Sequence, residues 1–311
     1  MKVKNFKAIK KLAYLLFPLL IISCGDEEVA KKVSLYQRPP VISKNSLQQP
    51  AEDILKFGFD LRLSPREEVR IYLPFLRYLE DYSGYKFSLR FTEKYEDTVE
   101  NLGRGVTNFA ALGPVNCILA KEKHGSKCLV MGLNAKGKPE YHAAIVTQID
   151  SPIKSIKDLR GRSFAFGDRF STQGHIIPRK MLEDAGVRLA DLKNYIFTGS
   201  HANTARAILN GEYEAGGMQD TLAQRLAAQG KLKIIAISKP YPSSLICAHK
   251  NVDPIILGAL KEALIAFDPQ NKHSGMVIDW HKTEMPNGFT LYKDGCLAEI
   301  KELMHKYLFE K

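Results

Sequence analysis

From residue 53 onward, short apolar runs alternate with longer stretches in which apolar residues recur every three or four positions. The first pattern is typical of β-strands and the second of amphipathic helices. We expect strands at residues 54–61, 86–91, 108–112, 128–133, 142–148, 163–166, 195–198, 213–218, 233–237 and 245–248. We expect helices at residues 65–82 (kinked or split at Pro74), 95–102, 171–185, 201–209, 221–229, 254–267 and 297–308.

This alternation predicts an α/β fold in which helices flank mixed, mostly parallel sheets. The pattern runs once through residues 53–148 and restarts at residue 163, so two lobes are expected. Ligands in open α/β sheets bind beyond the carboxyl ends of strands. The loops that follow the strands are therefore the segments to examine for a site.

The first residues carry a different signal. Residues 1–11 are basic, and residues 12–22 (LAYLLFPLLII) form an apolar run that is too short for a bilayer-spanning helix of about 20 residues. This order is typical of a secretory signal. The run ends in IISCG, which resembles a bacterial lipoprotein signal with Ile21 in place of leucine. The resemblance implies that Cys24 is lipid-modified; a plain signal peptide is the alternative.

The net charge adds little to the prediction of function. The chain has 311 residues and a formal charge of +11, but five lysines lie before residue 12, so removal of residues 1–23 leaves +6. This mild charge fits an anionic ligand, a membrane surface or a solvated basic surface, and does not indicate nucleic acid. Residues 25–51 are polar without sustained apolar periodicity, which predicts a flexible tether.

Four cysteines follow Cys24: Cys117, Cys128, Cys247 and Cys296. The sequence has no CxxC pair, which argues against a thiol-redox or zinc-ribbon site. Export would allow one or two disulfides, and the spacing does not give their pairing.

Residues 166–175 (FGDRFSTQGH) contain the most informative loop. A strand ends there, and Ser171 and Thr172 open a helix. A helix start has unpaired N–H groups and a partial positive charge, and the two hydroxyls add donors, so a small tetrahedral oxyanion could bind. An ordinary Ser/Thr N-cap is the alternative.

Two further loops have the same strand-to-helix form, and a fourth candidate loop lies in the first lobe. His201 follows one strand and could donate to an anion, or serve as a surface or capping residue. Asp220 follows another and is either an N-cap or an acceptor for a protonated oxyanion. Residues 112–117 (LGPVNC) form the fourth loop, in which Gly113 and Pro114 are expected to end the preceding strand.

Several motifs occur together in a fixed order: ALGP (111–114), YHAAIVTQIDSPIKSI (141–156), DLRGRSFAFGD (158–168), STQGHIIPRKMLEDAG (171–186) and TGSHANTARAILNGEYEA (198–215). Over residues 53–270 the chain resembles the phosphate/phosphite/phosphonate-binding proteins of ATP-driven importers. The resemblance implies a type II periplasmic-binding fold, whose two α/β lobes close about a two-strand hinge at residues 141–148 and 243–250.

The same resemblance implies a set of ligand-binding residues: Tyr95, Tyr141, Ser171, Thr172, Gln173, His201 and Asp220. Gln173 replaces a third hydroxyl of the family pattern, and Glu214 replaces an aspartate. Residues 242–244 (PSS) lack the acid expected to pair an amine, which favours phosphite, phosphate or methylphosphonate.

The resulting organisation is a signal peptide (1–23), a tether (24–51), lobe 1 (52–144 with 246–311) and lobe 2 (145–245). The predicted function is a monomeric, lipid-anchored, extracytoplasmic solute-binding protein that captures a small oxyanion for an ABC importer. It needs no cofactor or metal, and no nucleic-acid partner is expected.

Two other functions are open at this point. A sensor would present an oxyanion or arsenite to a membrane histidine kinase, with Cys117 reaching the cleft as a thiolate. An enzyme on this fold is the second, although the sequence contains no nucleophile elbow, HExxH or Walker loop.

Overall fold

The computed structural model describes residues 54–309 except residues 61 and 93–96. The predicted signal, Cys24, the tether and Tyr95 lie outside the described residues. The chain divides into a unit of residues 1–48 and a unit of residues 49–311, and the fold below is that of the second unit. Of the helices in this described part, none is both long and apolar enough to cross a bilayer.

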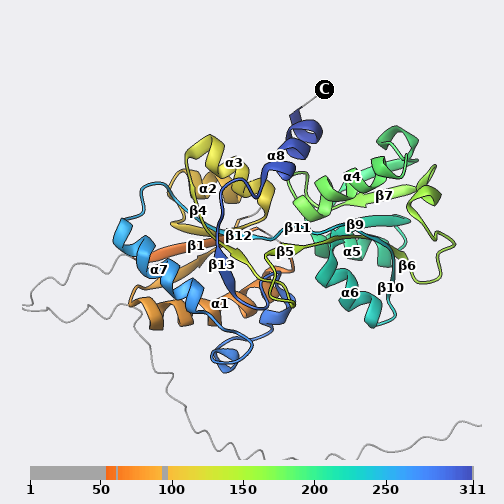
Figure 1. Cartoon of the computed structure of the whole chain (residues 1–311). Helices are drawn as coiled ribbons and strands as arrows, with labels where there is room; N and C mark the ends of the chain where they lie inside the picture. Colours follow the sequence, from red (N-terminus) through yellow and green to blue (C-terminus); the bar gives the residue numbers. More distant parts are fainter. Residues whose placement is uncertain (1–53, 61, 93–96, 310–311) are drawn as a thin grey trace, which may run out of the picture. The chain divides into compact units, whose positions relative to one another are not determined.

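Within residues 54–309, two main sheets form (Figure 1). The six-stranded sheet, in the order β13-β4-β12-β3-β1-β2, contains β1 (Leu55–Phe59), β2 (Phe87–Arg90), β3 (Phe109–Leu112), β4 (Lys127–Gly132), β12 (Leu245–Ala248) and β13 (Phe289–Leu291). The five-stranded sheet, in the order β10-β6-β9-β7-β8, contains β6 (Ala143–Gln148), β7 (Ser163–Phe166), β8 (Asn194–Phe197), β9 (Ala215–Gln219) and β10 (Leu232–Ile237).

Most strands of each described sheet run in one direction. In the six-stranded sheet β1, β2, β3 and β4 share a direction, while β12 and β13 run against them. In the five-stranded sheet β6 alone runs against the other four. The predicted α/β class with mixed, mostly parallel sheets is therefore confirmed. The reversed strands β6 and β12 are those that follow a crossing from one sheet to the other.

Helices cover both faces of each sheet. The six-stranded sheet packs against α1 (Pro65–Ser83), α2 (Asp97–Gly103), α3 (Pro114–His124), α7 (Pro254–Ala266) and α8 (Ala298–Met304). In Figure 1, α1 and α7 lie below this sheet and α2 and α3 above it. The five-stranded sheet packs against α4 (Ile177–Asp184), α5 (His201–Leu209) and α6 (Asp220–Ala228).

The alternation of side chains along β3 shows why this layering forms. Phe109 and Ala111 point into the apolar cluster under α1 and α7, whereas Ala110 and Leu112 join the cluster under α3 and α8. Successive residues of a strand face opposite sides of a sheet, so a strand covered on both sides reads as a continuous apolar run. Residues 108–112 were recognisable as a strand for this reason.

Three differences from the expected elements have physical causes. Helix α1 continues through Pro74, because Tyr72, Phe75 and Leu79 on the same helix are buried in the core, and this packing outweighs the lost hydrogen bond. Helix α3 was not expected. Pro114 occupies its first turn, and proline is tolerated there because the first N–H groups of a helix have no partner within the helix. The three-residue strand β13 gave too short a pattern to be expected.

The two chain crossings between the sheets pair with each other. The strands β5 (Glu140–Tyr141) and β11 (Tyr241–Pro242) form an antiparallel ladder, with Tyr141 opposite Tyr241. The hinge positions implied by the resemblance, 141–148 and 243–250, lie mostly beyond this ladder. Most of them belong to β6 and β12, each of which pairs with neighbouring strands on both sides, and the position of the hinge stays a prediction.

Candidate functional site

The starts of helices from both sheets meet at the candidate loops. The Thr172 hydroxyl accepts a hydrogen bond from the Val115 N–H in the first turn of α3, at 3.0 Å. Near α5, the Ala202 N–H donates to the carbonyl of Arg62 at 3.3 Å. Helix starts carry partial positive charge, so their convergence makes this region favourable for an anion.

Asp60, at the end of β1, fixes the start of α3. Its carboxylate accepts from the Gly113 N–H at 2.7 Å and from the Asn116 side-chain amide at 2.8 Å. Both bonds are buried, and they hold the α3 first turn against the β1 end. Asp60 is therefore a positioning residue for the Val115 donor.

Ser171 is the N-cap of the helical turn Thr172–Ile176, which continues into α4. Its hydroxyl accepts from the Gly174 N–H at 2.9 Å, and the side chain is buried. Gly174 packs closely against Gly167, Ser171 and His201: a Cβ there would stand 3.1 Å from the His201 ring. The glycine thus brings Ser171 and His201 together.

His201 is buried at the start of α5. Burial, with a smaller contribution from the nearby Arg62 guanidinium, lowers the pKa of His201 to about 3. The imidazole is therefore neutral at physiological pH. Among the described residues, His201 Nδ1 is one of the buried polar atoms without a hydrogen-bond partner. A neutral ring with an unused nitrogen can donate one hydrogen bond to an oxyanion.

Asp220 opens α6, and its carboxylate accepts from the Thr221 N–H at 3.0 Å. Burial, reinforced by the negative charge of Glu284, raises the pKa of Asp220 to about 6. A carboxyl with this pKa can either accept or donate a hydrogen bond near neutral pH. In the described structure, Gln219 Oε1 and Thr221 Oγ1 beside it are buried without partners.

Gln173 and Tyr141 connect this region to the crossing strands. The Gln173 amide donates to the carbonyl of His142 at 2.8 Å. Tyr141 is buried, and its hydroxyl hydrogen-bonds Thr172; burial raises the pKa of Tyr141 well above its usual value. The longer side chain at position 173 thus reaches the backbone that follows the crossing strand β5, where a serine hydroxyl would fall short.

The sequence interpretation missed a buried ionic cluster beside these residues. Arg62 pairs with Glu284 at 3.1 Å and donates to the Ser244 hydroxyl at 3.2 Å. Glu284 also accepts from Ser244. Glu68 accepts from the Arg62 and Leu63 N–H groups, and burial raises its pKa to about 7.

This cluster corrects one argument from the sequence. Residues 242–244 contain no acid, but the fold brings Glu284 against Ser244 from a distant segment. The expectation that no acid lies at this crossing is therefore wrong, whereas the preference for a ligand without an amine stays a prediction. Arg62 already compensates the charge of Glu284, and both side chains are almost fully buried.

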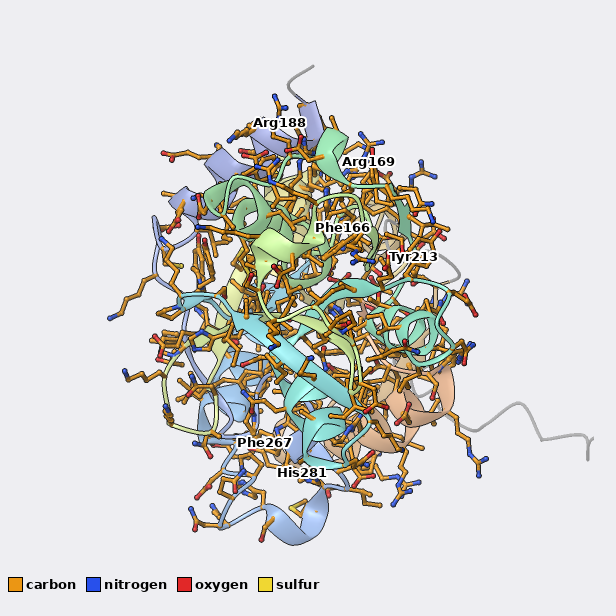
Figure 2. All side chains as sticks on the ribbon, turned by 90° about the vertical axis from the view of Figure 1, so that its right-hand side faces the viewer. Phe166, Arg169, Arg188, Tyr213, Phe267 and His281 are labelled. Atoms are coloured by element: carbon orange, nitrogen blue, oxygen red, sulfur yellow. The ribbon has the colours of Figure 1, made fainter. Side chains whose placement is uncertain are left out.

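The predicted site residues do not all face one cavity. Tyr141 and Asp220, with His142, Arg225 and Glu284, line an open pocket of about 620 Å³. Ser171, Thr172, Gln173 and His201 are buried and lie outside its lining. His281, another lining residue, lies at the lower end of Figure 2, whereas Phe166 and Arg169, which shortly precede Ser171 in the chain, lie in its upper half.

Cys117 does not reach this region, contrary to the expectation for an arsenite sensor. Its side chain is fully buried in the cluster under α3, with its Sγ 2.8 Å from Cys247 Sγ. Position 117 lies two residues, or about half a helical turn, after Val115 and so faces the sheet instead of the loops. Cys117 therefore does not supply the thiolate that the sensor hypothesis placed in the cleft.

Residues 57–286 match the family model of "ABC transporter, phosphonate, periplasmic substrate-binding protein". The chain belongs to this family. Its members are extracytoplasmic solute-binding proteins that work with ABC permeases. The family inferred from the motifs is thus confirmed.

Individual relatives are distant. The phosphate-import protein PhnD of Mycolicibacterium smegmatis is 27% identical over 260 residues, covering 78% of this chain and 77% of the relative. The phosphonates-binding periplasmic protein of Escherichia coli is 23% identical, covering 72% and 70%. The probable phosphite-binding protein PhnD1 of Prochlorococcus marinus is 25% identical, covering 59% and 60%.

Solved structures show the same fold. PhnD1 of Prochlorococcus marinus, in complex with methylphosphonate, superposes with a TM-score of 0.73 at 18% identity, covering 81% of this chain and 97% of that one. A phosphonate-transporter binding protein of Pseudomonas aeruginosa gives 0.73 at 20% identity, covering 82% and 86%. The type II periplasmic-binding fold expected from the sequence is confirmed.

Proposed function

We propose that this chain captures a small phosphorus oxyanion and hands it, unchanged, to an ABC permease. The observation that carries the proposal is the convergence of helix starts from both sheets, marked by the hydrogen bond from the Val115 N–H to Thr172. The relatives are named for phosphate, phosphonates and phosphite, and one solved neighbour holds methylphosphonate. Phosphite, phosphate and methylphosphonate are the ligands we favour.

In the proposed complex, the Ser171 and Thr172 hydroxyls and the N–H groups of their helix turn donate to the oxyanion. His201 adds a neutral donor through its unused nitrogen, and Asp220 faces the protonated oxygen of the ligand. Burial makes each of these bonds stronger than it would be in water. Tyr141 and Gln173 support Thr172 and the hinge, and Tyr95 stays a prediction.

Ligand entry requires the two lobes, residues 52–144 with 246–311 and residues 145–245, to separate. Thr172 now bonds Val115 directly, and Ala202 bonds Arg62, so an anion placed between these loops must replace or lengthen those contacts. The β5–β11 ladder is the short, two-residue connection about which such opening would occur.

The function is tested by calorimetric titration of the purified chain with phosphite, methylphosphonate, phosphate, 2-aminoethylphosphonate, sulfate and arsenite. We expect tight binding of one phosphorus oxyanion without turnover. Sulfate should bind at least tenfold more weakly, because it has no O–H group to donate a hydrogen bond to the Asp220 carboxylate. If none of the phosphorus anions binds, the proposal is contradicted, and binding of arsenite alone would favour a sensor.

We further propose that the protein acts as a monomer held at the outer face of a membrane by lipid on Cys24. The lipoprotein-like IISCG segment supports this anchor. Cells that express the chain should incorporate labelled palmitate into it and retain it in the membrane fraction. Cys24→Ala should abolish labelling and release the protein, while Cys296→Ala should change neither; labelling that persists in Cys24→Ala would contradict the anchor.

A further inference from the structure

Three cysteines far apart in the sequence meet inside the six-stranded-sheet lobe. Cys117 lies on α3, Cys128 on β4 and Cys247 on β12. Their sulfur atoms all lie within 4.8 Å of one another. Cys247 Sγ lies 2.8 Å from Cys117 Sγ and 3.8 Å from Cys128 Sγ.

The fold explains why these thiols converge. The antiparallel pairing of β12 with β4 places Cys247 directly opposite Cys128, beside a shift in register. Cys117, in the first turn of α3, covers this pair from the helix layer. All three positions are set by rigid elements, which is what a preorganised ligand set requires.

The cluster has an entrance of its own. Cys117 and Cys247 are fully buried, whereas Cys128 is partly exposed. Cys117 and Cys128 line a pocket of about 280 Å³ together with Lys121, Tyr292 and Lys301. An ion could therefore reach the thiols without passing the proposed oxyanion site, whose residues Asp220 and Tyr141 line a different pocket.

We propose that Cys117, Cys128 and Cys247 form a three-thiolate binding site for a divalent thiophilic metal ion of the Zn²⁺ class. Tetrahedral zinc binds thiolate sulfur at about 2.3 Å, which separates two ligands by about 3.8 Å. The separation between Cys247 Sγ and Cys128 Sγ, 3.8 Å, equals this value, and Cys117 Sγ, at 2.8 Å from Cys247 Sγ, would move outward by about 1 Å as the ion binds. The fourth coordination position faces the pocket, where a water molecule completes the shell.

Charge selects the class of ion. Three thiolates around a divalent ion leave a net charge of −1, whereas a monovalent ion such as Cu⁺ would leave −2 in a largely buried place. The Lys121 ammonium, on the wall of the same pocket, can offset one negative charge; it now lies 3.1 Å from Asp294 at the surface. The single positive charge of Lys121 can therefore compensate the net charge of −1 that three thiolates and a divalent ion leave.

The site is tested on the purified full-length chain, reduced and freed of metal, by titration with Co²⁺ as a coloured substitute for Zn²⁺. We expect one equivalent to give thiolate-to-cobalt charge-transfer absorption, which Zn²⁺ then removes. Zn²⁺ should also raise the melting temperature. Both effects should vanish in Cys128→Ser and persist in Cys296→Ser, whose sulfur contacts Met131 instead of the cluster.

X-ray absorption of the zinc-loaded wild-type chain needs no variant and should show about three sulfur neighbours at about 2.3 Å. A zinc shell of oxygen and nitrogen alone would overturn the proposal, as would a charge-transfer band that survives in Cys128→Ser. If Cys117 and Cys247 form a disulfide and the protein still binds no metal after that disulfide is reduced, the proposal is overturned too. Uptake of Cu⁺ with none of Co²⁺ or Zn²⁺ would contradict the choice of a divalent ion.

Discussion

Replacing Ser171 or His201 with alanine is expected to weaken binding of the phosphorus oxyanion by about 10- to 150-fold for each change. A hydrogen bond to a charged group contributes about 1.5–3 kcal/mol, and each variant removes one donor. Ser171→Ala also removes the N-cap that accepts from Gly174, which loosens the helix start. Calorimetry with the ligand identified by the titration measures both losses.

Two control variants separate binding from stability. Asp253→Ala removes an equivalent N-cap, the side chain that accepts from the Ile255 N–H at the start of α7. His273→Ala removes another buried histidine, one that packs on Phe267. Both should lower stability and leave affinity within about twofold of wild type. If the controls weaken binding as much as Ser171→Ala and His201→Ala do, the donors are not at the ligand.

Asp220→Asn is expected to change how affinity depends on pH. With its pKa near 6, Asp220 is largely ionised at pH 7–8 and accepts from a protonated oxyanion. Wild-type affinity should therefore fall as pH rises and the ligand loses its last proton. Asparagine can donate to the fully ionised ligand, so affinity of the variant should fall less, or rise, between pH 6 and pH 8.

The same pKa predicts a stability effect of definite sign. The carboxyl of Asp220 titrates near 6 in the folded chain, against an ordinary value of 3.8. Its raised pKa contributes stability below about pH 4, and this contribution is lost as pH rises through 6. Asp220→Asn should thus stabilise the ligand-free chain most at pH 8, by up to about 3 kcal/mol in urea unfolding. Equal unfolding midpoints for both proteins at every pH would contradict the raised pKa.

The sequence was informative where function depends on local structure. Ser171, His201 and Asp220 each follow a strand and begin a helix, and that pattern is visible in apolar spacing and capping residues alone. The resemblance then joined these positions to one ligand. Helix α3 was not predicted, because Gly113 and Pro114 were interpreted only as the end of the preceding strand. Proline is equally common in the first turn of a helix, and α3 begins at Pro114.

Long-range partners could not be predicted in this way. Arg62 and Glu284 are 222 positions apart, and their pairing depends on how two loops pack around β12. Cys128 and Cys247 become neighbours only through the ladder between β4 and β12. The spacing of residues along the chain does not indicate the register between strands. The ionic cluster and the thiol cluster are therefore seen only in the folded structure.

The most direct test of the central claim is a crystal structure of the chain bound to its tightest phosphorus oxyanion. We expect the phosphorus atom between the two sheets, with its oxygens hydrogen-bonded to Ser171, Thr172 and His201 and one of them facing Asp220. The contact between Val115 and Thr172 should be broken or bridged by the ligand. An anion held in the 620 Å³ pocket, away from Ser171 and His201, would contradict the proposed binding site.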